Sequence, residues 1–310
     1  MFPFPIHSPV DPLEFSLFRE KGITLHIKRD DLIHPFISGN KWRKLKHILE
    51  DAAQQGKTHL VTFGGAWSNH LLATACAGAR FGFKTTAFVR GEAVSNPNLS
   101  LCTLFGMELR FVDRASYRDK PSLFTRHFGS DEHAYFVDEG GYSAAGALGC
   151  GDIVHELSDT YDHIFCAAGT GTTLAGIASA LATSTPTTQL HGVPVLAGGE
   201  FIRDRIADLS TDAVAASCIL HTDYHFGGYA KTKPELLQFV KDFCAQTGIL
   251  IEPVYTGKLC YAVYDLAQHD YFTPGDKILI VHTGGLMGML GMEQKLHDKN
   301  PTIISGILAG

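Results

Sequence analysis

Short apolar segments alternate with helix-like segments along almost the whole chain, and this alternation restricts the fold more than any other feature. The first series of strand-like segments lies at residues 22–29, 59–63, 85–90, 108–112 and 134–137. The second series lies at residues 163–167, 190–196, 218–224, 249–255 and 277–281. Strands that are separated by helices run parallel, with helices covering both faces of the sheet. We therefore predict an α/β protein with two open, twisted, mostly parallel sheets flanked by helices.

The size and charge of the chain argue against several classes of partner. At 310 residues the chain suits two moderate domains, and its two strand series meet near residues 138–150. A net charge of −6 gives no general attraction for nucleic acid or an anionic membrane, and no apolar run reaches spanning length. The seven cysteines are scattered without metal-ligand spacing, which predicts reduced thiols in a cytoplasmic protein and no metal site.

The loop after the strand predicted at 163–167 has the composition of an anion-binding site. It places two glycines and three hydroxyl residues before an alanine-rich helix: Gly169, Thr170, Gly171, Thr172 and Thr173. Free backbone N–H groups and the helix dipole at such a terminus suit a phosphate dianion. The alternative is a turn that only caps the helix. The loop is not a P-loop, because no Gly-Lys-Ser/Thr follows it.

The loop after the strand predicted at 59–63 carries a second polar group, made of Trp67, Ser68, Asn69 and His70. We interpret it as a cradle for a substrate carboxylate or a cofactor. A simple helix cap by Ser68 is the alternative. A serine nucleophile is a weaker interpretation, because the surrounding residues do not form Gly-x-Ser-x-Gly.

Lys41 lies in the first turn of a predicted helix, for which Ser38 is the expected N-cap. On a helical wheel Lys41 shares one stripe with three apolar residues, Leu45, Ile48 and Ala52. Arg43 is predicted to point elsewhere. An inward ammonium group is costly unless it is paired or chemically used, so Lys41 is either functional or a snorkelling lysine.

A third group of candidates follows the strand predicted at 249–255, where Tyr255 and Thr256 would face the same crevice. Core packing is the alternative for Tyr255. An inward lysine, a phosphate cradle without Mg²⁺-binding carboxylates and a tyrosine–hydroxyl pair together suit pyridoxal 5'-phosphate. The lysine would bond the cofactor, the helix terminus would hold its phosphate, and its ring would accept electrons.

Seven motifs carry a family resemblance in order: 28–32 (KRDDL), 39–41 (GNK), 64–70 (GGAWSNH), 141–149 (GYSAAGALG), 170–173 (TGTT), 228–229 (GY) and 255–258 (YTGK). From about residue 27 to 287 the chain resembles the D-cysteine desulfhydrase and 1-aminocyclopropane-1-carboxylate deaminase family. That family belongs to the tryptophan-synthase-β-like pyridoxal phosphate enzymes of fold type II. The resemblance implies that Lys41 is the Schiff-base lysine, that Asn40 beside it contacts the cofactor, and that residues 169–173 bind the phosphate.

The resemblance also implies roles for the other candidates. Ser68 would work near the substrate, which residues 67–70 would bind, and Asn69 would contact the phenolic oxygen of the cofactor. Tyr229 and Tyr255 would be active-site tyrosines, and Thr256 would face the pyridine nitrogen. The implied large, cofactor-binding domain is discontinuous, with residues 1–45 and 145–310, and a small α/β domain spans residues 46–144. The active site would lie in the crevice between them, in a homodimer.

Two departures from the family pattern bear on the reaction. Trp67 stands where glutamine is usual, which alters the expected substrate pocket. Thr256 stands where the ring-opening deaminases carry glutamate, and a neutral hydroxyl keeps the pyridine nitrogen less protonated than a carboxylate does. We therefore predict a lyase that performs β-elimination on a small amino acid, above all D-cysteine to pyruvate, sulfide and ammonia. The alternatives are aminocyclopropane-carboxylate deamination or another D-amino acid lyase, a non-catalytic phosphate-ligand-binding protein, and a serine hydrolase.

Overall fold

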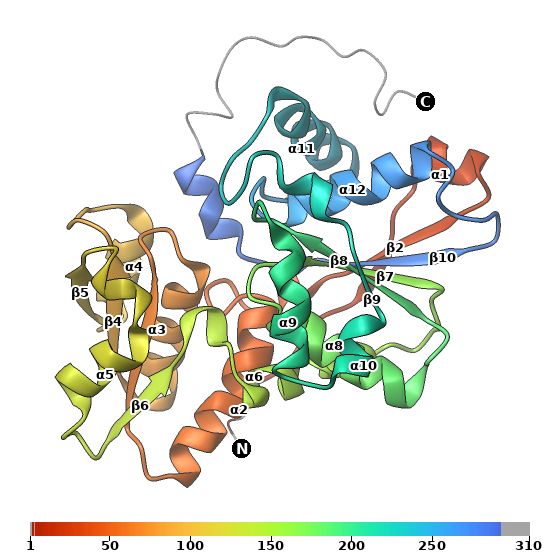
Figure 1. The fold of residues 1–310 in the computed structure, drawn as a ribbon. Coiled ribbons are helices and arrows are strands. Elements are labelled where there is room, and N and C mark those ends of the chain that lie inside the picture. Colours follow the sequence, from red (N-terminus) through yellow and green to blue (C-terminus); the bar gives the residue numbers. More distant parts are fainter. Residues whose placement is uncertain (1, 3, 293–310) are drawn as a thin grey trace.

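The computed structural model describes residues 2 and 4–292. It confirms the predicted α/β class, with two mostly parallel sheets flanked by helices (Figure 1). The outermost parts of the predicted large domain, at residues 1, 3 and 293–310, lie outside the described residues. The domain boundaries themselves stay predictions.

The larger sheet has six strands, and only its edge strand β1 runs antiparallel to its neighbour. Its spatial order is β1 (Val10–Pro12), β2 (Thr24–Lys28), β10 (Lys277–Val281), β7 (His163–Ala168), β8 (Gln189–Pro194) and β9 (Cys218–Leu220). Every residue of β7 is buried, as expected for a strand that helices cover on both faces. Phe165 packs against the helices on one face, whereas Ile164 and Cys166 pack against those on the other.

The smaller sheet has four parallel strands. Its order is β5 (Glu108–Val112), β4 (Lys84–Arg90), β3 (His59–Gly65) and β6 (Ala134–Val137). Leu60 on β3 faces the α2 and α3 side, and the next residue, Val61, faces the α5 side. In Figure 1 this sheet and its helices lie at the left, beside the larger sheet.

Helices that each have an apolar face toward the sheet cover both sheets. Those nearest the smaller sheet are α2 (Asn40–Gln54), α3 (Asn69–Phe81), α4 (Pro97–Leu104) and α5 (Lys120–Phe128). One face of the larger sheet carries α1 (Ser16–Glu20), α11 (Pro234–Thr247) and α12 (Thr256–Gln268). The other face carries α6 (Ala144–Cys150), α7 (Asp152–His155), α8 (Thr172–Ser184), α9 (Ile202–Ala207) and α10 (Asp212–Ala216). None of the described helices combines the length and apolar character that crossing a bilayer requires.

The prediction of a strand at 249–255 is wrong. This segment has no regular secondary structure before a turn that leads into α12, and it has no partner strand in the described sheets. The buried carboxylate of Glu252 accepts hydrogen bonds from the backbone N–H groups of residues 254–256, at 2.7–2.8 Å. Because these donors are satisfied by a side chain, the segment starts a helix instead of joining the sheet.

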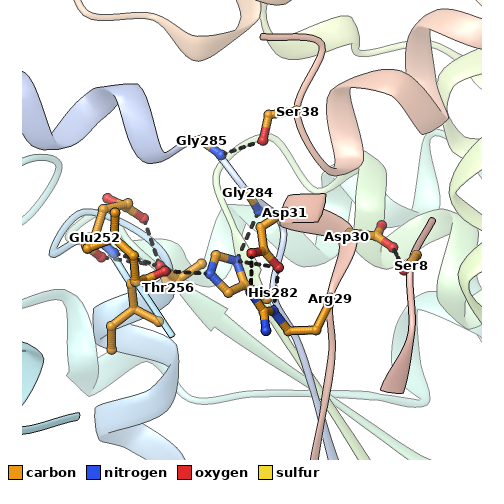
Figure 2. A network of polar contacts seen from close by, with 12 residues as sticks. Ser8, Arg29, Asp30, Asp31, Ser38, Glu252, Thr256, His282, Gly284 and Gly285 are labelled. Carbon is orange, nitrogen blue, oxygen red and sulfur yellow. Dashed lines mark hydrogen bonds and ion pairs between the residues drawn. The ribbon is translucent and has the colours of Figure 1, made fainter. Parts of the chain in front are cut away.

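The prediction that Ser38 caps the helix is also wrong. The cap position of α2 is Gly39, with a φ of 58°, and no side chain caps the helix there. The Ser38 hydroxyl instead accepts a hydrogen bond from the N–H of Gly285, 3.1 Å away (Figure 2). A Cβ on Gly39 would lie 1.9 Å from the carbonyl oxygen of Thr283, so only glycine lets α2 start against the end of β10.

Candidate active site

A cavity of about 660 Å³ lies where the carboxyl ends of strands from both sheets meet. This volume falls within the usual range of small-molecule sites, and the position is the one expected for ligands of parallel α/β sheets. Most of the candidate residues line it: Asn40, Lys41, Trp67, Ser68, Asn69, His70, Gly169, Thr170, Gly171, Thr173, Tyr229 and Tyr255. Two do not. Thr172 and Thr256 are buried behind the cavity wall.

Lys41 reaches the cavity from the first turn of α2. Its Nζ donates a hydrogen bond to Asn40 Oδ1 at 2.9 Å. The other residues of its stripe, Leu45, Ile48 and Ala52, are buried against the smaller sheet. Desolvation, followed by the positive charge of Lys44, lowers the pKa of Lys41 from 10.5 to about 7. About half of the amine is therefore unprotonated near neutrality, and a nucleophile or base needs this form.

The glycine–threonine loop forms the N-terminus of α8, directly after β7. Gly171 caps the helix with a φ of 84°, a left-handed conformation that suits glycine. The hydroxyls of Thr170 and Thr172 lie 3.0 Å apart, and Asn40 Nδ2 donates to Thr173 Oγ1 at 3.0 Å. The loop is thus joined to the first turn of α2, beside Lys41. Open N–H groups at this terminus can hold a phosphate.

Lys44 is a residue of this site that sequence reasoning missed. Its side chain is buried and lines the cavity, and its Nζ donates to the carbonyl oxygen of Gly140 at 3.0 Å. A Cβ on Gly140 would lie 3.0 Å from Thr170 Cγ2, so Lys44 lies close to the α8 terminus. The signal in the sequence was a second lysine one helical turn after Lys41.

The N-terminus of α3 forms the opposite wall. The Ser68 hydroxyl caps it by accepting from the N–H of Leu71 at 3.4 Å. The Thr62 hydroxyl donates to a backbone carbonyl, so it accepts from Nε2–H of His70, 2.8 Å away. Nδ1 of His70 is then an acceptor. Desolvation, followed by the charges of Lys41 and Lys44, lowers the pKa of this imidazole well below 6.5 and keeps it neutral.

Two buried acceptors in this wall have no partner. Neither Nδ1 of His70 nor Oδ1 of Asn69 makes a hydrogen bond to any described residue, although both residues line the cavity. Buried polar atoms are nearly always satisfied, so orphaned acceptors beside a cavity indicate a polar ligand. A Cβ on Gly285 would lie 2.3 Å from Asn69 Nδ2, so the chain after β10 confines this amide closely.

Two tyrosines close the side of the cavity that faces α12. The rings of Tyr229 and Tyr255 meet edge to face, with centroids 6.0 Å apart. A Cβ on Gly169 would lie 3.2 Å from the Tyr255 ring, so the tyrosine packs directly over the glycine–threonine loop. The buried Lys258 Nζ donates to the carbonyl oxygens of His225 and Gly228, both at 2.8 Å, and so fixes the loop that carries Tyr229.

Thr256 lies at the start of α12 with its hydroxyl turned to Glu252 (Figure 2). The hydroxyl accepts from the Glu252 N–H at 3.0 Å and lies 3.3 Å from Glu252 Oε1. Glu252 itself lines the cavity, and desolvation raises the pKa of its carboxyl group. The predicted contact between Thr256 and a pyridine nitrogen therefore stays a prediction.

These features fit pyridoxal 5'-phosphate. A lysine with a lowered pKa, an open helix terminus with a nearby second lysine, and orphaned acceptors around one cavity match an aldehyde, a phosphate and a phenolic ring. The arrangement is the kind expected of an enzyme with a phosphorylated cofactor.

Comparison with known proteins gives the family. Residues 8–284 match the sequence profile described as "Pyridoxal-phosphate dependent enzyme", so the chain belongs to this family and pyridoxal 5'-phosphate is its cofactor. It is 32% identical to a protein of Pyrococcus horikoshii provisionally named 1-aminocyclopropane-1-carboxylate deaminase, over 94% of this chain and 93% of that protein. It is 31% identical to D-cysteine desulfhydrase of Yersinia enterocolitica, over 85% of this chain and 87% of that protein.

A solved structure agrees with these relatives. The structure described as an ACC deaminase homologue is 30% identical and covers 94% of each chain, with a TM-score of 0.83. The chain is therefore a fold type II pyridoxal phosphate enzyme of the deaminase and desulfhydrase group, as the sequence motifs indicated.

Proposed function

We propose that this enzyme performs β-elimination on a small amino acid, with D-cysteine as the leading candidate and pyruvate, sulfide and ammonia as products. The observation that carries the proposal is the neutral Thr256 at the start of α12, where ring-opening deaminases of the family carry a glutamate. Glu252, the carboxyl group nearby, is bound to the turn before α12 by three backbone N–H groups, and desolvation raises its pKa, which favours the neutral form. Elimination of a good leaving group stores less charge in the cofactor ring than ring opening does.

Lys41 would hold the cofactor and later act on the substrate. Bound pyridoxal phosphate supplies the electron sink for the carbanion chemistry. Residues 169–173 and Lys44 would hold the phosphate, and Asn40 would fix the Lys41 amine through the 2.9 Å hydrogen bond. Lys41 would also take the α-proton of the substrate, because its pKa of about 7 matches a base that works near neutrality.

The N-terminus of α3 would bind the substrate carboxylate. The first N–H groups of a helix lack carbonyl partners within it, and their dipole favours an anion. Ser68, Asn69 and His70 begin this helix at the cavity. Asn69 would also contact the phenolic oxygen of the cofactor, and the Ser68 hydroxyl would lie beside the substrate. Tyr229 and Tyr255 would orient the leaving group.

Trp67 would limit the size of the substrate. Its ring lies against Gly291, where an added Cβ would be 2.9 Å from the indole, and both residues line the cavity. The indole therefore takes room that a smaller or more polar side chain would leave open. This favours a short amino acid.

The elimination is tested by measuring keto-acid release from D- and L-cysteine, D-serine, β-chloro-D-alanine and 1-aminocyclopropane-1-carboxylate. We expect pyruvate from D-cysteine and β-chloro-D-alanine. Release of 2-oxobutanoate from the cyclopropane substrate, without pyruvate from the others, would establish the alternative deaminase activity instead.

The lysine assignment is tested separately by substitution. Lys41→Ala should abolish turnover and the visible absorbance of the lysine-bound cofactor. Lys46→Ala is the matched control, because Lys46 pairs with Asp152 at 3.1 Å and does not line the cavity. Retention of the visible band in Lys41→Ala would contradict the assignment.

We also infer a cytoplasmic homodimer. All seven cysteines are free thiols, which suits a reducing compartment, and the family resemblance implies the dimer. Light scattering on the purified holoenzyme tests the dimer, and a monomer mass would contradict it.

A further inference from the structure

The cavity has a surplus of basic side chains that the proposed function uses only in part. Its lining holds four basic side chains, Lys41, Lys44, Arg90 and Arg114, against two carboxyl groups, Glu139 and Glu252, and the proposed function uses the two lysines but neither arginine. The chain as a whole carries a net charge of −6. A local excess of cations in an acidic protein indicates an anionic ligand, because like charges that converge on a cavity repel one another until an anion binds.

Arg90 is held at the cavity by the register of the smaller sheet. It is the last residue of β4 and pairs with Gly65, which begins the loop that leads to Ser68. A Cβ on Gly65 would lie 3.8 Å from Arg90 Nη2, so the guanidinium lies over the side-chain-free face of that glycine. The guanidinium carbon is 5.4 Å from the centre of the buried Tyr117 ring, which supports it from below.

Arg114 reaches the same cavity from the neighbouring strand. It follows β5 by two residues, and β5 pairs in parallel with β4, so the chain leaves both strands at the same edge. Apart from the contact of Arg90 with the Tyr117 ring, neither the Arg90 nor the Arg114 guanidinium makes a hydrogen bond or ion pair with a residue that the structure describes. Of the two acidic groups that share the cavity, Glu139 is 3.6 Å from Lys120, and Glu252 accepts from the backbone N–H groups of residues 254–256.

The other anionic groups of the proposed reaction have binding sites elsewhere in the cavity. The cofactor phosphate would take the α8 terminus with Lys44, and the substrate carboxylate would take the α3 terminus. Arg90 and Arg114 line the same cavity as Tyr229 and Tyr255, the tyrosines that would orient the leaving group. The two arginines are therefore left for the side chain of the substrate.

We propose that Arg90 and Arg114 form a subsite for an oxyanion on the β-carbon of the substrate, a sulfonate or a phosphate ester. The planar guanidinium group binds two oxygens of such a group at once, which a thiol or a chloride cannot offer. This inference rests on the proposed β-elimination and names a class of leaving group for it.

The elimination balances without a further reactant. With a sulfonate, the Cα–H bond breaks and its electron pair forms the Cα–Cβ double bond, while the C–S bond breaks and its electrons leave with sulfite. Lys41 accepts the α-proton. Water then hydrolyses the released enamine to pyruvate and ammonia. A phosphate ester reacts in the same way by cleavage of its Cβ–O bond. The arginines stabilise the charge that grows on the departing oxyanion.

The kinetic test compares substrates that differ only in the leaving group. We would measure pyruvate release by the holoenzyme from cysteate, O-phosphoserine and β-chloroalanine, each as both enantiomers. The wild-type enzyme should turn over at least one of the two oxyanion substrates. Arg90→Gln should lower the kcat/KM for the oxyanion substrate relative to the kcat/KM for β-chloroalanine by about 10- to 100-fold. This is the usual effect of removing a charge-assisted hydrogen bond. Arg114→Gln should act in the same direction.

Arg118→Gln is the matched control. It removes an exposed arginine four residues after Arg114 that does not line the cavity, and it should leave the ratio unchanged. An equal loss with all substrates in Arg90→Gln would assign this arginine to the shared α-carboxylate and overturn the inference. Turnover of β-chloroalanine without turnover of either oxyanion substrate would also overturn it.

A binding measurement separates this inference from the proposed reaction. Calorimetry would compare 3-sulfopropanoate with butanoate, which lack the amine and cannot react. We expect tighter binding of the sulfonate, and loss of that preference in Arg90→Gln. Tighter binding of 3-sulfopropanoate than of butanoate, without elimination from any substrate, would support the subsite and contradict the proposed reaction. Elimination from β-chloroalanine without the preference would contradict the subsite alone.

Discussion

The lowered pKa of Lys41 can be tested by removing its charged neighbour. Desolvation is its largest cause, and Lys44, one helical turn away, is the second. With a pKa of about 7, about half of Lys41 is unprotonated at pH 7. An amine with the ordinary value of 10.5 would be unprotonated in only about one molecule in three thousand. Burial of the first turn of α2 therefore makes the amine roughly a thousand-fold more available.

Lys44→Met should raise the pKa of Lys41 without restoring the ordinary value. Two like charges about 6 Å apart, at an effective dielectric constant of about 20, repel by about 3 kcal/mol. This corresponds to a rise of at most about 2 pH units when the second charge is removed. Desolvation remains in the variant. Lys46→Met is the control, because its Nζ pairs with Asp152 outside the cavity.

The pKa can be measured by competitive acetylation of the cofactor-free enzyme between pH 5 and 11, with peptide mass spectrometry to follow each lysine. We expect half-maximal reactivity of Lys41 near pH 7 in wild type and Lys46→Met, and at higher pH in Lys44→Met. A wild-type midpoint near pH 10 would refute the desolvation argument. An unchanged or lower midpoint in Lys44→Met would refute the contribution of Lys44.

Three further outcomes follow from the structure. In the cofactor-free enzyme, Lys41 binds fewer protons when folded than when unfolded between pH 7 and 10.5, so the free energy of unfolding should rise with pH there. The rise relative to Lys41→Met is about 1.4 kcal/mol per pH unit, measured by urea denaturation. Gly39→Ala should cost about 3 kcal/mol or more and weaken cofactor binding, because its Cβ would clash with a carbonyl oxygen at 1.9 Å; unchanged thermal stability would contradict this. Arg43→Met should cost about 3–5 kcal/mol, because it leaves buried Asp30 without its cationic partner, whereas Glu156 keeps its ion pair with Lys28 at 2.9 Å; chemical denaturation measures the loss, and a neutral effect would show that the Arg43–Asp30 pair is dispensable.

Arg43 shows where periodicity stopped being informative. The helical wheel placed it away from the apolar stripe, yet its side chain is buried and bonds Asp30 at 2.7–3.0 Å and Glu156 at 2.5–2.8 Å. A wheel identifies one buried face, but α2 packs against the smaller sheet on one side and against α6 on the other. A Cβ on Gly149 would lie 1.9 Å from the Arg43 carbonyl oxygen, which shows how closely α6 approaches.

The prediction of a strand at 249–255 failed for a related reason. Its apolar and β-branched residues have strand propensity, but a strand also needs a partner, and a propensity argument does not supply one. Glu252 offers its backbone N–H groups a carboxylate instead. A charged residue in a run that is otherwise apolar was the available sign that this run would not behave as a central strand.

The sequence by itself determined the α/β class, the two series of strands and the motifs that identify the cofactor. These depend on local periodicity and on residues that are adjacent in the chain, such as Gly171 at a strand-to-helix turn. Only the tertiary structure decided which charged groups face the cavity. Lys44, Arg90 and Arg114 come from different elements, and parallel strand ends bring the two arginines together at one edge. Whether a cation is buried, paired or left free depends on partners that lie far away in sequence, and local patterns do not encode them.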